Sequence, residues 1–313
     1  MRSPTTPCSL ALLASLAFAC GGSTASSAQS PGQNGDASTT GDDASSSSEG
    51  DDGGSSSPPI AQNASFGTYI VLGDSISDRG GQGPFFYDLL HQNDDTTYPT
   101  WQGHDLATKY PGIQYVHAAV AGSISGAYGD TLTTGAPLLT TQIAGLGSSY
   151  PGDVLVTITI GGNDLNDHAG DAILGLDGTD KMKFTANLKA DLDTLMAPNR
   201  LGSGKVYVLE ANIYDASDGQ GDWKSKGGPA CPPYDVSSTQ DTSAFAAWNQ
   251  IISDAVTAHP GDNLWDIHAL FSGHGFNSTD NWYYSDCIHP NEKGHDELRK
   301  EAWRMLTGEE ISD

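Results

Sequence analysis

The sequence predicts an α/β domain in which a mainly parallel sheet lies between two layers of helices. Short apolar, β-branched segments alternate with longer amphipathic segments over residues 61–313, as is typical of a parallel sheet covered on both faces. The apolar segments are followed by Gly, Ser, Asn or Asp, the residues expected where a strand turns toward a helix. In such a fold, ligands bind beyond the carboxyl ends of the strands.

Five strands are expected, each a short run rich in Val, Ile, Leu or Tyr. The clearest contains Val-Leu-Val-Thr-Ile-Thr-Ile and ends before Gly161. The predicted strands cover residues 69–72, 112–120, 153–160, 205–212 and 263–267.

The expected helices fill the segments between these strands and the end of the chain. Leu188, Leu192 and Leu195 recur at the spacing of one helical face, which predicts a helix packed on the core. Residues 219–242, rich in Gly and Pro, are expected to form a long loop. The predicted helices cover residues 85–93, a short segment near Leu106, and residues 138–146, 184–196, 243–258 and 291–306.

The chain begins with a segment typical of an exported protein. In residues 1–19, Arg2 precedes a short apolar run that ends in Ala17-Phe18-Ala19, as in a signal peptide. Residues 20–60 are rich in Ser, Gly and Asp and lack an apolar period, so we expect a disordered tether before a hydrolase domain at residues 61–313.

Cys20 is a candidate for lipid attachment. Ala-Cys-Gly-Gly-Ser resembles a bacterial lipobox, although Ala17 and Phe18 depart from its usual pattern. A lipidated Cys20 would give a cell-surface or periplasmic lipoprotein. Cleavage by an ordinary signal peptidase is the alternative, and would give a secreted protein.

The charge balance excludes one class of partner. The chain has 14 Lys and Arg residues against 39 Asp and Glu, a net charge of −25 at pH 7, so nucleic acid is not an expected partner. No run after the leader reaches the ~20 apolar residues of a membrane span, so contact with a membrane is expected only through the lipid. We expect a monomer.

Four cysteines are present, and Cys8 would leave with the leader. In an oxidising compartment the remaining odd number suggests that one thiol is otherwise occupied. A lipidated Cys20 with a disulfide between Cys231 and Cys287 satisfies this parity. Two unrelated buried thiols are the alternative.

Four polar signatures follow predicted strands and together suggest nucleophilic catalysis. Ser75 follows the first strand, but a serine hydroxyl needs a base within hydrogen-bond reach. His289 can take and return the proton, and Asp286, three residues earlier, can orient its ring. The backbone N–H groups of Ser75 and Gly122 and the side-chain amide of Asn163 can stabilise an oxyanion.

Each of these residues also has an ordinary structural interpretation. Gly122 is explained by a turn, Asn163 by a helix cap, and Asp286 with His289 by a surface pair or metal ligands. No other His, Cys or Glu set has metal-ligand spacing, so no metal is expected. The catalytic interpretation is favoured because four unrelated turns would all have to imitate one site in order.

The sequence resembles the GDSL, or SGNH, hydrolases over roughly residues 66–306. Four blocks carry this resemblance: Gly73-Asp74-Ser75-Ile76, Gly122, Gly161-Gly162-Asn163-Asp164 and Asp286-Cys287-Ile288-His289. The resemblance implies a flavodoxin-like, three-layer α/β/α sandwich with a mainly five-stranded parallel sheet, and no cofactor.

The resemblance also implies the role of each site residue. Ser75 would be the nucleophile, His289 the base and Asp286 its orienting partner, with Ser75, Gly122 and Asn163 as oxyanion donors. Two positions depart from the family pattern: Ile76 replaces the usual Leu, and His117 stands where the second block often has Asn.

These observations predict an exported serine esterase that cleaves carboxylic esters through an acyl-enzyme. The first substrate hypothesis is an acetyl group on a carbohydrate, with Trp223, Trp282, Tyr283 and Tyr284 as aromatic residues that could stack on sugar rings. The alternatives are a lipase or lysophospholipase acting on longer acyl chains, a peptidase, and a surface-binding lipoprotein without catalysis.

Overall fold

The computed structural model describes residues 59–60, 63–220 and 242–312. The predicted signal peptide and nearly all of the tether, and with them Cys20, lie outside the described residues, as do Trp223 and Cys231. Within the described residues, no helix combines the length and the apolar composition needed to cross a membrane.

A parallel sheet forms the middle of the domain, and every adjacent pair of its strands runs in the same direction. This confirms the α/β class and the five-stranded parallel sheet. The order is β2-β1-β3-β4-β5, so the chain leaves β1 toward β2 and returns to the other side of β1 as β3. The strands are β1 (Phe66–Gly73), β2 (Gln114–His117), β3 (Asp153–Thr159), β4 (Val206–Ala211) and β5 (Asp262–Trp265).

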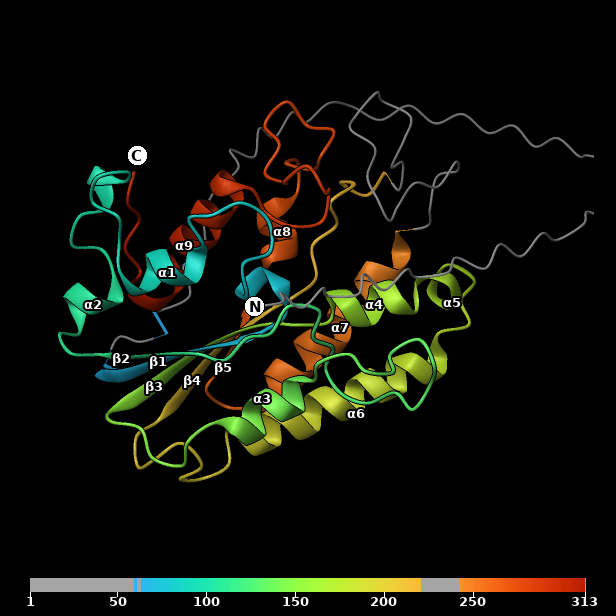
Figure 1. Cartoon of the computed structure of the whole chain (residues 1–313), viewed down its shortest axis with the longest axis horizontal. Helices are drawn as coiled ribbons and strands as arrows, with labels where there is room; N and C mark the ends of the chain where they lie inside the picture. The colour runs from blue at the N-terminus through green and yellow to red at the C-terminus, as the bar shows by residue number, and fades with distance from the viewer. Residues whose placement is uncertain (1–58, 61–62, 221–241, 313) are drawn as a thin grey trace, which may run out of the picture. The chain divides into compact units, whose positions relative to one another are not determined.

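Helices cover both faces of this sheet (Figure 1). The α-helices are α1 (Phe86–His91), α2 (Leu106–Lys109), α3 (Leu139–Gly145), α4 (Gly162–Asp167), α5 (Ala169–Ile173), α6 (Gly178–Leu195), α7 (Ser243–Ala258), α8 (Ile267–Phe271) and α9 (Glu292–Thr307). Two 3₁₀ turns are η1 (Ser75–Ser77) and η2 (Pro99–Trp101).

The alternation of side chains along β1 divides the core in two. Tyr69 and Val71 pack on the face covered by α1 and α9, whereas Ile70 and Leu72 pack on the face covered by α3, α6 and α7. All four side chains are fully buried, which is why this strand is a continuous apolar run.

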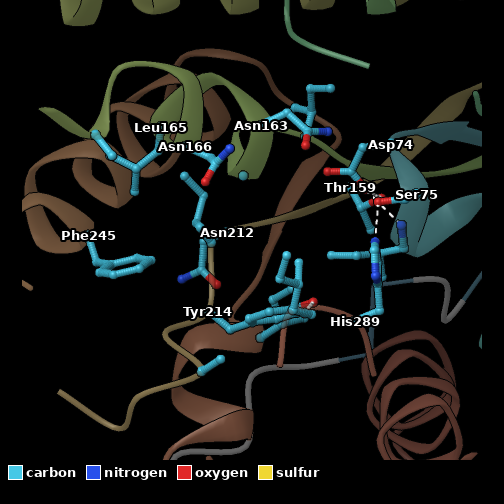
Figure 2. Close-up of a pocket in the computed structure, with 18 of the residues that line it drawn as sticks. Asp74, Ser75, Thr159, Asn163, Leu165, Asn166, Asn212, Tyr214, Phe245 and His289 are labelled. Atoms are coloured by element: carbon cyan, nitrogen blue, oxygen red, sulfur yellow. Dashed lines mark hydrogen bonds between the residues drawn. The ribbon is translucent and has the colours of Figure 1, made fainter. Parts of the chain in front are cut away.

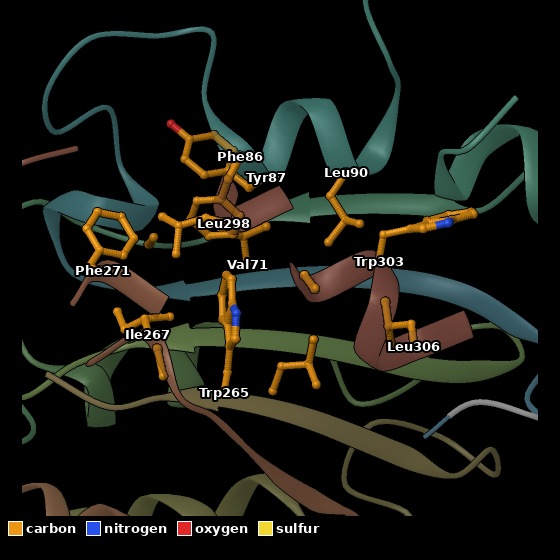
Figure 3. Close-up of a cluster of buried hydrophobic side chains, with 14 of the residues drawn as sticks. Val71, Phe86, Tyr87, Leu90, Trp265, Ile267, Phe271, Leu298, Trp303 and Leu306 are labelled. Atoms are coloured by element: carbon orange, nitrogen blue, oxygen red, sulfur yellow. The ribbon is translucent and has the colours of Figure 1, made fainter. Parts of the chain in front are cut away.

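The α1/α9 side of the core is rich in aromatic residues (Figure 3). Phe86 of α1 meets the indole of Trp265 edge to face, with ring centroids 5.2 Å apart. Helix α9 contributes Leu298, Trp303 and Leu306 to this cluster, and together with Ala302 they form one apolar stripe along the helix. This packing holds the start of α9, and the turn before it, over the carboxyl ends of the strands.

Several predicted boundaries are wrong, among them the start of the first strand, which lies at Phe66 and not at Tyr69. The second strand ends at His117, although the N–H groups of Ala118 and Val120 still donate to carbonyls of β1. The fifth strand ends at Trp265, because Asp266 accepts a hydrogen bond from the N–H of Ala269 and starts α8. The helix expected over residues 184–196 already begins at Gly178.

Candidate active site

Ser75, His289 and Asp286 form one continuous chain of hydrogen bonds. The Oγ of Ser75 lies 2.7 Å from Nε2 of His289, and Nδ1 of His289 lies 2.6 Å from Oδ2 of Asp286 (Figure 2). A carboxylate oxygen only accepts, so Nδ1 carries the ring proton and Nε2 is left to accept from the Ser75 hydroxyl. The structure thus brings together the three predicted triad residues in the arrangement that makes a serine nucleophilic.

The position of Ser75 depends on the backbone at the end of β1. Gly73 has φ +121°, and a Cβ there would lie 2.2 Å from the carbonyl oxygen of Thr159, so only glycine fits. Asp74 then caps η1 by accepting a hydrogen bond from the N–H of Ile76 at 3.0 Å. Its carboxylate also accepts a hydrogen bond from the hydroxyl of Thr159 at 2.8 Å. Burial raises the pKa of Asp74 to about 6.

The turn before α9 fixes the base. Oδ1 of Asp286 accepts from the N–H groups of Ile288 and His289, each at 3.0 Å, which leaves Oδ2 for the ring. Burial opposes ionisation of Asp286, but the hydrogen bonds from the His289 ring and these two N–H groups hold its pKa below the usual value. Asp286 is therefore a carboxylate at neutral pH, as an orienting residue must be.

Asn163 lies in the first turn of α4 and borders the same cavity as Ser75. Its Nδ2 donates to the carbonyl of Ser123 at 2.9 Å, and a primary amide retains a second N–H. The neighbouring Asp164 is fully buried and accepts from Ser125 and from the Tyr128 hydroxyl, so it anchors α4 instead of facing the cavity.

Gly122 lies in the turn that the N–H of Ser123 closes on the carbonyl of Val120. Its φ is +80°, and a Cβ there would contact no protein atom within 4 Å. Backbone conformation, not contact with neighbouring protein atoms, therefore favours glycine. The structure places Gly122 next to Ser123, the residue that Asn163 holds, but Gly122 is not among the residues that line the cavity.

Gln142 of α3 joins two of the signatures, and sequence analysis did not identify it. Its Nε2 donates to the carbonyl of Gly73 and to the Ser123 hydroxyl, both at 2.8 Å, and its Oε1 accepts from the N–H of Gly73 at 2.8 Å. This buried amide fixes the end of β1 against the Gly122–Ser123 turn. No local signal marks it, because a glutamine on a short helix usually faces solvent.

A cavity of about 450 Å³ opens beside the triad. Ser75 and His289 lie on one side of it, and Leu165 and Phe245 on the opposite side (Figure 2). Asn212 and Tyr214, which follow β4, also line it, and the strand-end rule that found Ser75 could have found them.

The aromatic residues proposed for sugar stacking do not line this cavity where they are described. Trp282 and Tyr283 are buried in the core, and Trp282 stacks on His274 with ring centroids 3.6 Å apart. Tyr284 is exposed, and Trp223 lies outside the described residues. Cys287 is fully buried, and its pairing with Cys231 stays a prediction because Cys231 lies outside the described residues.

Several solved structures resemble the chain at low identity. A phospholipase A1 from Streptomyces albidoflavus NA297 is 20% identical, with 77% of this chain and 98% of that chain covered and a TM-score of 0.43. An acetylxylan esterase from Geobacillus stearothermophilus is 16% identical, covering 82% and 99%, with a TM-score of 0.43. A putative GDSL-like lipase from Parabacteroides merdae ATCC 43184 is 15% identical, covering 80% and 99%, with a TM-score of 0.47.

A family model gives the wider relationship. No curated protein matches the chain. The model of the GDSL-like lipase/acylhydrolase family matches residues 71–297, which include all four sequence blocks and the complete triad. The chain therefore belongs to the GDSL-like lipase/acylhydrolase family.

Proposed function

We propose that this protein is a serine hydrolase of carboxylic esters. The observation that carries the proposal is the unbroken hydrogen-bond chain from Asp286 through His289 to Ser75 at the wall of a cavity. A binding protein would have no need for a nucleophile activated in this way.

The reaction would proceed in two halves. Ser75 Oγ attacks the acyl carbon while His289 Nε2 takes the hydroxyl proton, and Asp286 stabilises the resulting imidazolium. The Asn163 amide and the backbone N–H of Ser75, which both border the cavity, stabilise the tetrahedral oxyanion, and Gly122 in the adjoining turn is the third predicted donor. The alcohol leaves with the proton from His289, and a water molecule activated by His289 then hydrolyses the acyl-enzyme.

On the acyl side, we propose an aliphatic chain longer than acetyl. The cavity is lined mainly by aliphatic and aromatic side chains, among them Leu165, Ile213 and Phe245, which lie beyond the catalytic residues. Its volume of about 450 Å³ lies within the ~300–1,000 Å³ range of ligand pockets, whereas an acetyl group would leave most of it unfilled. Apolar lining favours an apolar occupant because burying apolar surface is favourable. A carbohydrate O-acetyl esterase is the second hypothesis.

A series of 4-nitrophenyl esters from acetyl to palmitoyl tests both the serine mechanism and the preferred acyl length. The wild type should hydrolyse the series, Ser75→Ala should not, and kcat/KM should rise from acetyl to a longer chain. Leu165→Phe should shift the optimum to shorter chains because it narrows the cavity. Leu176→Phe is the matched control, since Leu176 is exposed and lies away from the cavity.

The serine mechanism and the preference for a longer acyl chain can be contradicted independently. Wild-type turnover by Ser75→Ala would exclude the serine mechanism. An optimum at acetyl that Leu165→Phe leaves unchanged would exclude the longer acyl chain and favour the O-acetyl esterase.

We also propose that the protein is exported and lipidated at Cys20. The apolar leader, the lipobox-like Ala-Cys-Gly-Gly-Ser and the Ser/Gly/Asp-rich segment after it support this proposal. Cys20→Ser should abolish incorporation of labelled palmitate and release the protein from membrane fractions. Cys8→Ser is the control and should do neither, because Cys8 would be removed with the leader. Membrane association that survives Cys20→Ser would contradict the lipid anchor.

A further inference from the structure

Three side chains from separate segments converge away from the cavity: Asp130, His168 and Asp180. Asp130 lies in the loop between β2 and α3, His168 joins α4 to α5, and Asp180 lies in the first turn of α6. One oxygen from each carboxylate and one nitrogen of the imidazole all lie within 4.8 Å of one another. Nε2 of His168 is 3.3 Å from Oδ2 of Asp130 and 3.8 Å from Oδ1 of Asp180.

The hydrogen bond on the other side of the ring decides what Nε2 can do. Nδ1 of His168 lies 2.8 Å from the carbonyl oxygen of Asp164, which can only accept, so Nδ1 carries a proton. Nε2 then faces two carboxylates, and this arrangement suits either a proton on Nε2 or a cation that Nε2 and both carboxylates bind together. Histidines that bind metals are typically oriented in this way, with the second nitrogen donating to a backbone carbonyl.

Apart from His168 itself, the surroundings supply no positive charge to the two carboxylates. In the part of the chain that the structure describes, neither Asp130 nor Asp180 pairs with a lysine or arginine. Lys181 pairs with Asp177 at 3.1 Å, and Lys183 donates to the carbonyl of Tyr128. His168 is only 3% exposed, so solvent screens the cluster poorly.

The spacing fits a small divalent cation. Ligand atoms about 2.1 Å from a tetrahedral ion lie about 3.4 Å from one another, close to the two distances measured from His168. Oδ1 of Asp130 is already held by the N–H and hydroxyl of Thr133 at 2.9 and 2.8 Å, which orients Oδ2 toward the ring. One imidazole and two carboxylates suit a first-row ion such as Zn²⁺ better than Ca²⁺, which takes 6–8 oxygen ligands.

We propose that His168, Asp130 and Asp180 bind one divalent first-row cation, with Zn²⁺ as the reference ion. The ion would join the loop after β2 and the start of α6 to the junction of α4 and α5. Leu165 of α4 and Ala169 of α5 line the cavity, so the site stabilises one of its walls. The ion takes no part in the reaction at Ser75.

The fold contains a matched control in His259. Its Nδ1 also lies against a backbone carbonyl, that of Ala255 at 2.7 Å, and its Nε2 lies 3.0 Å from Oδ1 of Asp193. This ring meets a single carboxylate, however, and Lys189 already pairs with that carboxylate at 2.5 Å. His259→Gln therefore removes a similarly bonded histidine without removing the proposed site.

The test uses the full chain, stripped with EDTA and titrated with Zn²⁺ by calorimetry and thermal unfolding. At a hundredfold excess over Kd, Zn²⁺ should raise Tm by about 5 °C in the wild type and in His259→Gln. In His168→Gln and Asp180→Asn, the affinity should fall by ~10-fold or more and the rise in Tm should disappear. Asp180→Asn keeps the side-chain shape, so it decides the matter if His168→Gln does not fold.

Two results would overturn the proposal. Zn²⁺ binding that is equal in the wild type, His168→Gln and Asp180→Asn would place the ion elsewhere on the chain. No Zn²⁺ binding by the wild type, together with a protonated Nε2 of His168 in ¹⁵N spectra at neutral pH, would make the cluster an imidazolium ion pair only.

Discussion

At the scale of single residues, two side-chain amides lie close to the nucleophile and have different surroundings. Asn163 borders the cavity, and one of its side-chain N–H groups is not used in the bond to Ser123. In Gln142, by contrast, Oε1 and Nε2 both form hydrogen bonds to Gly73, and Nε2 also donates to Ser123. Only the first can reach a substrate oxygen. We therefore expect Asn163 to act on the reaction directly and Gln142 to act through the backbone that it positions.

Asn163→Ala should lower kcat by ~100-fold or more with a smaller change in KM, because its amide stabilises charge present mainly in the transition state. Steady-state kinetics on the preferred 4-nitrophenyl ester measures this split. Asn166→Ala is the control, since Asn166 borders the same cavity one turn along α4. A change confined to KM would make Asn163 a residue that positions the substrate.

At the scale of secondary-structure elements, the inner strand β4 carries an ionisable side chain into the core. Glu210 is fully buried, and neither of its carboxylate oxygens has a hydrogen-bond partner among the described residues. Asp262 of β5 pairs in register with Val208, two residues before Glu210, so the two carboxyl groups lie on the same face of the sheet. Burial and then the charge of Asp262 raise the pKa of Glu210, and burial raises the pKa of Asp262 to about 7.

These raised pKa values make the stability of the fold depend on pH. The ordinary values are about 4, so the folded state binds more protons than the unfolded state above that pH. The free energy of unfolding should therefore fall as the pH rises from about 4 through the raised pKa values of both groups, of which that of Asp262 is about 7. Glu210→Gln should reduce the loss of Tm between pH 5 and pH 8, as measured by calorimetry. The exposed Glu310→Gln should leave the loss unchanged, and a wild-type pH dependence in Glu210→Gln would contradict the assignment.

The sequence predicted a helix or strand correctly wherever it contained a recognisable apolar period or a clear end to an apolar run. The helix over Ser243–Ala258 was predicted at its observed bounds, and its buried residues Trp248, Ile252 and Val256 recur every four residues. Helices α4, α5 and α8 were missed: α4 and α5 each contain one large apolar residue and so show no period, and the predicted fifth strand extended to Ile267, the first residue of α8.

The same limit applies to the candidate site. Ser75 and Asn163 could be predicted because they lie two and four residues after the ends of their strands. Gln142 and the cluster around His168 could not, since they depend on contacts between segments far apart in the chain. No local pattern records such contacts.

At the scale of the whole molecule, the predicted disulfide would connect the turn before α9 with the loop after β4. Cys287 lies inside that turn, between Asp286 and His289, and is fully buried. A bond to Cys231 would close a loop of about 55 residues and stabilise the fold by ~4 kcal/mol on the chain-entropy model. It would also restrain the residues that aim His289 at Ser75.

Cys231→Ser, Cys287→Ser and the reduced wild type should therefore all lose stability and activity to similar extents, because a displacement near 1 Å can cost ~100-fold in rate. Melting curves and ester hydrolysis measure both effects. Peptide mapping of the unreduced protein is the direct check, and two free thiols at these positions would exclude the bond.

The strand order has a consequence for how the protein loses activity on heating. Ser75 and Asn163 follow β1 and β3, which are adjacent and paired up to Gly73 and Thr159. His289 instead lies in a turn outside the sheet, held by hydrogen bonds of Asp286 and by the Tyr214 hydroxyl on the Ile288 carbonyl. Backbone amides of β1 and β3 should exchange with deuterium only through global unfolding, whereas those of residues 284–289 should exchange through local opening. If the turn opens locally, activity should fall at a temperature below Tm and return on cooling. Equal exchange rates in the strands and in residues 284–289 would rule out this local opening.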